Sequence, residues 1–145
     1  TLATTPAPVL DLGCGLGLLA HALQLGGVAA PYLGLDFDAD KCDAATQAAQ
    51  AAGLAARFEC ADFLAADPAR SLPDHAGSVV LCDVLQYLPA EAQHRLVAAA
   101  CTRVGQGGVL LLRTGLMDAS ERARFTRLVD VVAHRVGQSD EKACI

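Results

Sequence analysis

The sequence has no stretch of about 18 apolar residues, the length that an α-helix needs to cross a bilayer. Its most apolar segment, residues 10–25, is interrupted by Asp11, three glycines and His21. It also has no basic segment followed by an apolar run and a cleavage site, the pattern of an export signal. These absences argue against a membrane-spanning or exported protein, and we expect a cytoplasmic one.

Basic residues are outnumbered. The chain has 11 Lys and Arg against 16 Asp and Glu, which gives a formal net charge of −5. An acidic domain repels the phosphate backbone of a nucleic acid. We therefore expect no nucleic-acid partner for this domain alone.

Metal-binding cysteine motifs are absent as well. The six cysteines include no Cys-x-x-Cys pair, and the four histidines do not combine with them at the spacing of a zinc site. We expect no metal ion. Cys14, Cys60 and Cys82 lie in or beside apolar runs, so we expect reduced thiols that pack as small buried hydrophobic groups.

What the sequence does contain is enough apolar material for one core. Of its 145 residues, 53% are hydrophobic, which suits a single domain spanning residues 1–145. The chain begins at Thr1, and the first predicted strand starts within ten residues of it. We expect a piece of a longer protein, truncated at both ends.

Short apolar runs alternate with helical segments along the chain. Strands are predicted at 8–12, 32–36, 54–60, 78–82 and 109–113, and helices at 17–25, 39–52, 89–105 and 119–136. Each strand is a continuous apolar run, which is typical of a parallel sheet covered by helices on both faces. With right-handed crossovers, the chain is predicted to form a doubly wound α/β fold that binds ligands at the carboxyl ends of its strands.

Capping residues support several of these boundaries. Asp38 is suited to cap the helix 39–52, and Gly53 is suited to end it. Pro89 fits the first turn of the helix that follows it. The segment around Pro68 is predicted to form a single helical turn.

The strand 109–113 is the last one predicted, and one of its edges needs a further element to cover it. If no element follows the helix 119–136, this strand is an exposed edge rich in apolar residues, which favours aggregation. We therefore expect a missing C-terminal segment or a partner chain, such as a second copy in a homodimer, to cover it.

Three alternate glycines, Gly13, Gly15 and Gly17, follow the first strand directly. Without Cβ atoms, a turn of this kind lets the backbone approach a ligand closely. The free N–H groups of the next helix point to the same place. The turn therefore predicts binding of a nucleotide-like cofactor.

Motifs at the ends of successive strands make the prediction more specific. The segments 11–17, 34–38, 61–63, 82–88 and 107–112 resemble, in order, the motifs of class I S-adenosylmethionine-dependent methyltransferases. The resemblance implies a Rossmann-like core and S-adenosylmethionine as the cofactor. Members of this family usually continue into a C-terminal antiparallel hairpin, and we expect this chain to lack it.

The resemblance also implies roles for residues that would hold the cofactor. The loop residues Gly13, Cys14, Gly15 and Gly17, with Asp11 at the strand end, would face the methionine moiety. Asp36 would accept from both ribose hydroxyls, the alternative being a surface acid that caps a turn. Phe37 would lie against the adenine, unless it packs in the core.

After the third strand, Asp62 would accept from the adenine amino group, with Phe63 or Leu64 in apolar contact. Its alternative role is to cap the next turn. An acidic site suits a sulfonium cation better than a pyrophosphate.

On the acceptor side, the resemblance places Asp83, Gln86 and Tyr87 near the transferred methyl group, and Asp83 near the cofactor as well. In-line methyl transfer needs a general base only for a protonated acceptor. Gln86 cannot be that base. Asp83 could be, or it could be a structural acid, and Tyr87 could instead pack under the next helix. The catalytic residues remain unassigned.

The segment 82–88 contains neither Asn/Asp-Pro-Pro-Tyr/Phe nor Pro-Cys, which resemble signatures of amine and cytosine C5 methylation. We therefore expect a small-molecule acceptor, methylated at O, N or C. One alternative is a cofactor-binding module without catalysis, part of a larger enzyme. Another is an NAD-dependent oxidoreductase, but its G-x-G-x-x-G/A loop disagrees with the third glycine at position 17.

Overall fold

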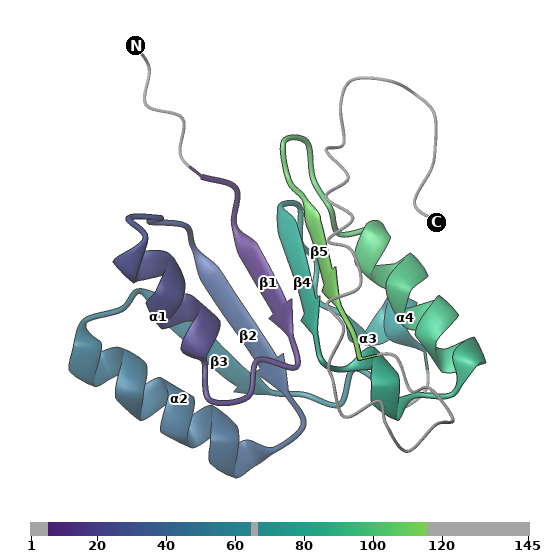
Figure 1. Ribbon diagram of the computed structural model, residues 1–145, viewed down its shortest axis with the longest axis horizontal. Coiled ribbons are helices and arrows are strands. Elements are labelled where there is room, and N and C mark those ends of the chain that lie inside the picture. The colour runs from purple at the N-terminus through teal and green to yellow at the C-terminus, as the bar shows by residue number, and fades with distance from the viewer. Residues whose placement is uncertain (1–5, 65–66, 116–145) are drawn as a thin grey trace.

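The computed structural model describes residues 6–64 and 67–115 (Figure 1). Its strands are β1 (Val9–Leu12), β2 (Tyr32–Asp36), β3 (Ala56–Cys60), β4 (Ser78–Cys82) and β5 (Leu110–Arg113). They form one parallel sheet in the order β3-β2-β1-β4-β5. The predicted doubly wound α/β fold is confirmed, and each strand begins within two residues of its predicted start.

The helices are α1 (Leu18–Leu25), α2 (Ala39–Ala52), α3 (Pro68–Ser71) and α4 (Ala90–Cys101), with a short 3₁₀ helix, η1, at Leu85–Tyr87. Figure 1 shows α1 and α2 beside β1, β2 and β3, and α3 and α4 beside β4 and β5. Within the described ranges, no helix combines the length and apolar character needed to span a membrane. The predicted helix 119–136 lies outside the described residues.

The hydrophobic core has one part on each face of the sheet, because successive side chains of a strand point to opposite faces. The larger part includes Leu10, Leu12, Val79, Leu81 and Leu96, and the smaller part includes Val9, Ala20, Tyr32 and Val80. Both faces of β1 and β4 are therefore buried. This burial explains why their sequences are continuous apolar runs rather than alternating ones.

The ends of α2 are capped as predicted. The Asp38 carboxylate accepts from the N–H groups of Asp40 and Lys41, and Gly53 adopts the left-handed conformation with φ of 68°. Pro68 begins α3, which confirms the single predicted turn.

The boundaries of α4 differ from the prediction. Pro89 precedes the helix as its N-cap instead of lying in its first turn, and the helix ends at Cys101 rather than near Gly105. The reason is a tertiary contact: the Gly105 N–H donates to the Gly77 carbonyl at 2.9 Å. The chain leaves the helix early so that Gly105 can pack against the segment before β4.

The strand order places the candidate site. From β1 the chain winds outward through β2 to β3, and then crosses to the other side of β1 to form β4. In sheets of this kind ligands bind at that switch point, outside the carboxyl ends of the strands. β5 is an edge strand of the described sheet, and coverage of this edge by a further segment or a second copy stays a prediction.

Candidate functional site

The glycine loop, residues 13–17, joins β1 to α1 and is held on the end of β2. The Leu35 carbonyl accepts from the N–H groups of Gly13 and Cys14, at 2.7 and 3.0 Å. Gly13, Gly15 and Gly17 have φ values of 82°, 54° and 78°, in the left-handed region that glycine adopts without steric cost. Any other residue would be strained at these three positions, so the three glycines allow the loop to adopt this conformation.

The three glycines differ in what surrounds them. A Cβ on Gly13 would collide with Val84, and a Cβ on Gly17 would lie 2.6 Å from the Phe58 ring. Protein packing alone therefore requires glycine at these two positions. A Cβ on Gly15 would meet nothing within 4 Å. Gly15 is thus the place where this loop leaves its outer side open to a ligand.

Asp36, at the carboxyl end of β2, lies directly beside Gly15. One carboxylate oxygen accepts from the Gly15 N–H at 2.9 Å, and the other accepts from the Asp38 N–H at 3.0 Å. The side chain is only 6% exposed. Asp36 therefore caps a local turn, as in the alternative role given above. It is a buried acid rather than a surface one, and it also orients the glycine loop.

Large apolar side chains are exposed around this point. Phe37 is 71% exposed, and Leu16 in the glycine loop is 54% exposed. The exposure of Phe37 excludes the alternative that its ring packs in the core. An exposed aromatic ring beside a buried carboxylate offers a stacking surface next to a hydrogen-bond acceptor.

Asp11 is placed differently from the prediction. Its carboxylate is 4% exposed and accepts a hydrogen bond from the Tyr32 hydroxyl beneath the loop, instead of facing the ligand's amino-acid end. Burial raises the pKa of the Asp11 carboxyl to about 6; the Tyr32 hydrogen bond opposes the rise, and the neighbouring Asp36 adds to it. The cause is register, because Tyr32 pairs with Val9 at the start of the strand and its side chain reaches along the sheet to Asp11.

Cys14 is also buried within the loop. Burial and the negative charge of Asp11 raise the pKa of its thiol to about 12, so it is an unreactive thiol at neutral pH. Gly34 on β2 makes room for it, because a Cβ there would lie 2.8 Å from the Cys14 sulfur. Any ligand contact of Cys14 therefore comes from its backbone.

After β3, Asp62 is exposed and Phe63 is not. The Asp62 carboxylate accepts from the Leu64 N–H at 3.1 Å, which is the capping role named as its alternative. Phe63 is 2% exposed and packs in the larger core cluster. Its predicted contact with the cofactor is thus disfavoured by burial, and the half-buried Leu64 is the better apolar neighbour.

The loop after β4 is linked to the end of β5. The Arg113 guanidinium pairs with the Asp83 carboxylate through two hydrogen bonds, and the Thr114 hydroxyl donates to the Gln86 side-chain oxygen at 3.3 Å. The Asp83 carboxylate is therefore engaged in an ion pair with a side chain of the neighbouring strand. Tyr87 is 80% exposed, which excludes packing under α4.

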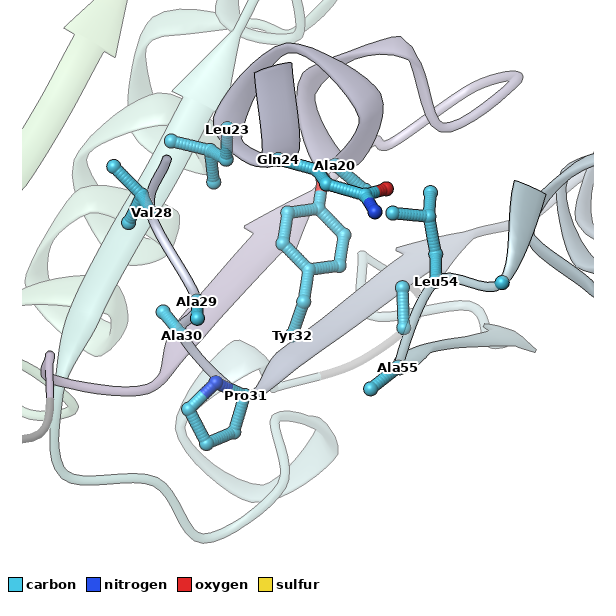
Figure 2. A pocket seen from close by; sticks show the side chains of 12 residues that line it. Ala20, Leu23, Gln24, Val28, Ala29, Ala30, Pro31, Tyr32, Leu54 and Ala55 are labelled. Atoms are coloured by element: carbon cyan, nitrogen blue, oxygen red, sulfur yellow. The ribbon is translucent and has the colours of Figure 1, made fainter. Parts of the chain in front are cut away.

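A pocket of about 470 Å³ lies elsewhere, at the amino ends of β2 and β3 (Figure 2). Apolar side chains such as Leu23, Val28 and Leu54 line it, together with the Tyr32 ring. The glycine loop lies at the other end of the strands, next to their carboxyl ends. Because doubly wound folds bind ligands at the carboxyl edge, we do not assign the cofactor to this pocket.

Metal ligands do not gather in the described part of the chain, which has no group of three or more His, Cys, Asp or Glu that could hold an ion. Cys82 is half-buried and Cys14 is buried, as expected of packed thiols, but Cys60 is exposed. Cys60 differs because β3 is an edge strand, and only Phe58 and Ala56 of that strand pack into the smaller core cluster.

Comparison with known proteins identifies the family. The sequence model of the methyltransferase-domain family matches residues 9–108, from β1 to the segment before β5. The chain belongs to this family. The matched range includes every strand end described above except that of β5, and the predicted resemblance is confirmed.

Structures of several methyltransferases share the fold of this domain. An O-methyltransferase family protein from Burkholderia thailandensis is 28% identical, with a TM-score of 0.65 over 78% of this chain and 34% of that one. An S-adenosylmethionine-dependent methyltransferase from Clostridium acetobutylicum is 20% identical, with a TM-score of 0.60 over 74% of this chain and 42% of that one. A search of curated proteins finds no match.

A third structure contains the product of the cofactor. The plantazolicin methyltransferase BpumL, in complex with a pentazolic desmethylPZN analog and S-adenosylhomocysteine, is 18% identical, with a TM-score of 0.58 over 78% of this chain and 40% of that one. The chain therefore spans less than half the length of each of these three relatives. Membership of this methyltransferase family confirms the predicted cofactor, S-adenosylmethionine.

The residues present fit that cofactor better than a dinucleotide. The open side of Gly15 offers a cradle for a ligand, and the carboxylate beside it is suited to hydroxyl groups and to a cation. A dinucleotide loop of the pattern G-x-G-x-x-G/A that starts at Gly13 would need glycine or alanine at position 18, where this chain has Leu18. The NAD-dependent alternative is therefore disfavoured.

Several residues of this region were not predicted from the sequence. Arg113, Thr114 and Val84 contact the predicted site residues, and Tyr32 holds Asp11. Arg113 had one available signal: it is a charged residue at the carboxyl end of an apolar strand, where ligand sites of this fold lie.

Proposed function

We propose that this methyltransferase domain transfers a methyl group from S-adenosylmethionine to a small-molecule acceptor at oxygen, nitrogen or carbon. The observation that carries the cofactor-binding part of the proposal is the pairing of Gly15 with Asp36. A backbone position with open space on its outer side is held by a buried carboxylate at 2.9 Å. A ligand can therefore approach the backbone closely at Gly15 and have its hydroxyls recognised by Asp36 at the same place.

Each side of the site has its own role in this proposal. The Asp36 carboxylate has lone pairs left after accepting two N–H groups, so it can also accept from the ribose hydroxyls. The N–H groups of residues 13–15 and of Gly17 already have acceptors, so the start of α1 is the part that binds the carboxylate of the methionine moiety. Phe37 offers its exposed ring, and Asp62 its exposed carboxylate, to the adenine.

On the acceptor side, the protein acts by holding the acceptor in position. When bound, the cofactor supplies a methyl group on a positively charged sulfur. Asp83 and Gln86 are already engaged with Arg113 and Thr114, so we assign neither as a general base. Holding the acceptor in line, at about 3 Å from the methyl group, supplies much of the acceleration. Tyr87, exposed on η1, provides an apolar surface for the acceptor.

Two observations support a small acceptor. BpumL, which shares the fold, is in complex with a pentazolic desmethylPZN analog. The net charge of −5 disfavours a nucleic-acid acceptor.

The test is a transfer assay with the 145-residue chain. Labelled S-adenosylmethionine is incubated with panels of small phenols, amines and carbon acids, and the release of S-adenosylhomocysteine and the labelled product are measured. We expect transfer to at least one class, and unchanged transfer in the control Arg57→Gln, whose exposed ion pair with Glu59 lies on β3. Transfer only to DNA or RNA would contradict the proposal.

A second candidate is a cofactor-binding module that acts only within a larger enzyme. The observation that favours it is the short span of the chain relative to the three methyltransferase structures. A module would bind S-adenosylhomocysteine and transfer no methyl group to any acceptor. Addition of flanking sequence would then restore transfer.

A further inference from the structure

Asp83, at the carboxyl end of β4, has an unusual backbone conformation. It is the one non-glycine residue among those described whose φ is positive, at 59°. This conformation is strained for a residue with a side chain, although Asp adopts it more readily than most, and it persists where the surroundings hold it. The structure must therefore supply that hold.

Arg113 supplies it from the neighbouring strand. The Asp83 N–H donates to the Arg113 carbonyl at 2.9 Å. The Arg113 Nε donates to one oxygen of the Asp83 carboxylate at 3.2 Å, and its Nη2 donates to the other. Asp83 is thus held by one residue through its backbone and its side chain together. An exposed ion pair alone would contribute little, but this one is a fork fixed at two adjacent strand ends.

The turn at Asp83 determines where the next residue lies. Val84 packs against the larger core cluster, and its Cγ2 fills the space where a Cβ on Gly13 would be. Val84 is therefore the contact between the β4 loop and the glycine loop. A different backbone conformation at Asp83 would move Val84 away from Gly13.

We propose that Arg113 is a positioning residue of the cofactor site. It holds Asp83 in the left-handed turn, the turn holds Val84 against Gly13, and the glycine loop keeps the form that binds S-adenosylmethionine. The inference rests on the proposed function of this site. Without Arg113 the turn relaxes, and cofactor binding has to restore it.

The experiment is a calorimetric titration of S-adenosylhomocysteine into the 145-residue chain and four variants. Arg113→Gln and Asp83→Ala should each weaken affinity roughly fivefold, the equivalent of about 1 kcal/mol for restoring the turn. Asp83→Gly should keep the wild-type affinity, because glycine adopts the left-handed conformation without a partner. The double variant Asp83→Gly with Arg113→Gln should keep it as well.

Glycine rescue is the decisive comparison. If Asp83→Gly binds as weakly as Asp83→Ala, the carboxylate itself contacts the ligand and the proposal is wrong. If Arg113→Gln lowers the melting temperature but leaves affinity unchanged, the pair is merely structural and the proposal is wrong again. Arg57→Gln, which breaks an exposed pair on β3, is the matched control and should bind normally. If the wild-type chain does not bind, the proposed function fails and not this inference alone.

Discussion

Replacement of Asp36 by alanine is the most informative single change in this domain. In the structure its carboxylate accepts from the N–H groups of Gly15 and Asp38 and is 6% exposed. Two consequences follow from Asp36→Ala. The two N–H groups lose their acceptor, which should lower the free energy of unfolding by about 2–3 kcal/mol. The ribose contact and the orientation of Gly15 are lost together, which should weaken cofactor binding by about 2–4 kcal/mol, roughly 30- to 700-fold.

The assay is calorimetric titration with S-adenosylhomocysteine, with urea unfolding run on the same samples. Asp38→Ala is the matched control, because it removes a carboxylate two residues away that caps α2. This control should lose about 1 kcal/mol of stability and keep its affinity. A folded Asp36→Ala variant that binds normally would refute the assignment of Asp36 as the ribose anchor.

Two further predictions concern the glycine loop and the acid beneath it. Gly15→Val should abolish S-adenosylhomocysteine binding in titrations and cost about 1 kcal/mol of stability. Gly17→Val should mainly lower stability in urea unfolding, because its Cβ meets the Phe58 ring. Equal losses of stability in the two variants would contradict this prediction. The pKa of Asp11 is raised from 3.8 to about 6 on folding, so the folded state binds the proton more tightly and stability falls as pH rises through that interval, by about 3 kcal/mol. Asp11→Asn should remove this slope from urea unfolding between pH 4 and pH 7, and an unchanged slope would argue against the buried Asp11.

The fold could be predicted from the sequence because its strands are buried on both faces. Continuous apolar runs such as 78–82 are buried at the centre of the sheet in a small domain. The caps at Asp38 and Gly53 act locally. The end of α4 could not be predicted. It depends on Gly105 packing against Gly77, a contact between distant segments that leaves no local signal.

The candidate site was predicted in part for the same reason. Gly15 and Asp36 lie at the ends of successive strands, where chain position alone brings them together. Arg113 and Asp83 are 30 residues apart, and their pairing depends on strand order and register. The burial of Asp11 depends on the length and direction of the Tyr32 side chain, which sequence position does not indicate.

The central claim is that the loop 13–17 and Asp36 hold S-adenosylmethionine. It is tested most directly by calorimetric titration of the wild-type chain with S-adenosylhomocysteine, with NAD in a parallel titration and Gly15→Val as the loop control. The account predicts micromolar binding of S-adenosylhomocysteine, no heat from NAD, and loss of binding in Gly15→Val. Binding of NAD alone, or S-adenosylhomocysteine binding that survives in Gly15→Val, would contradict it.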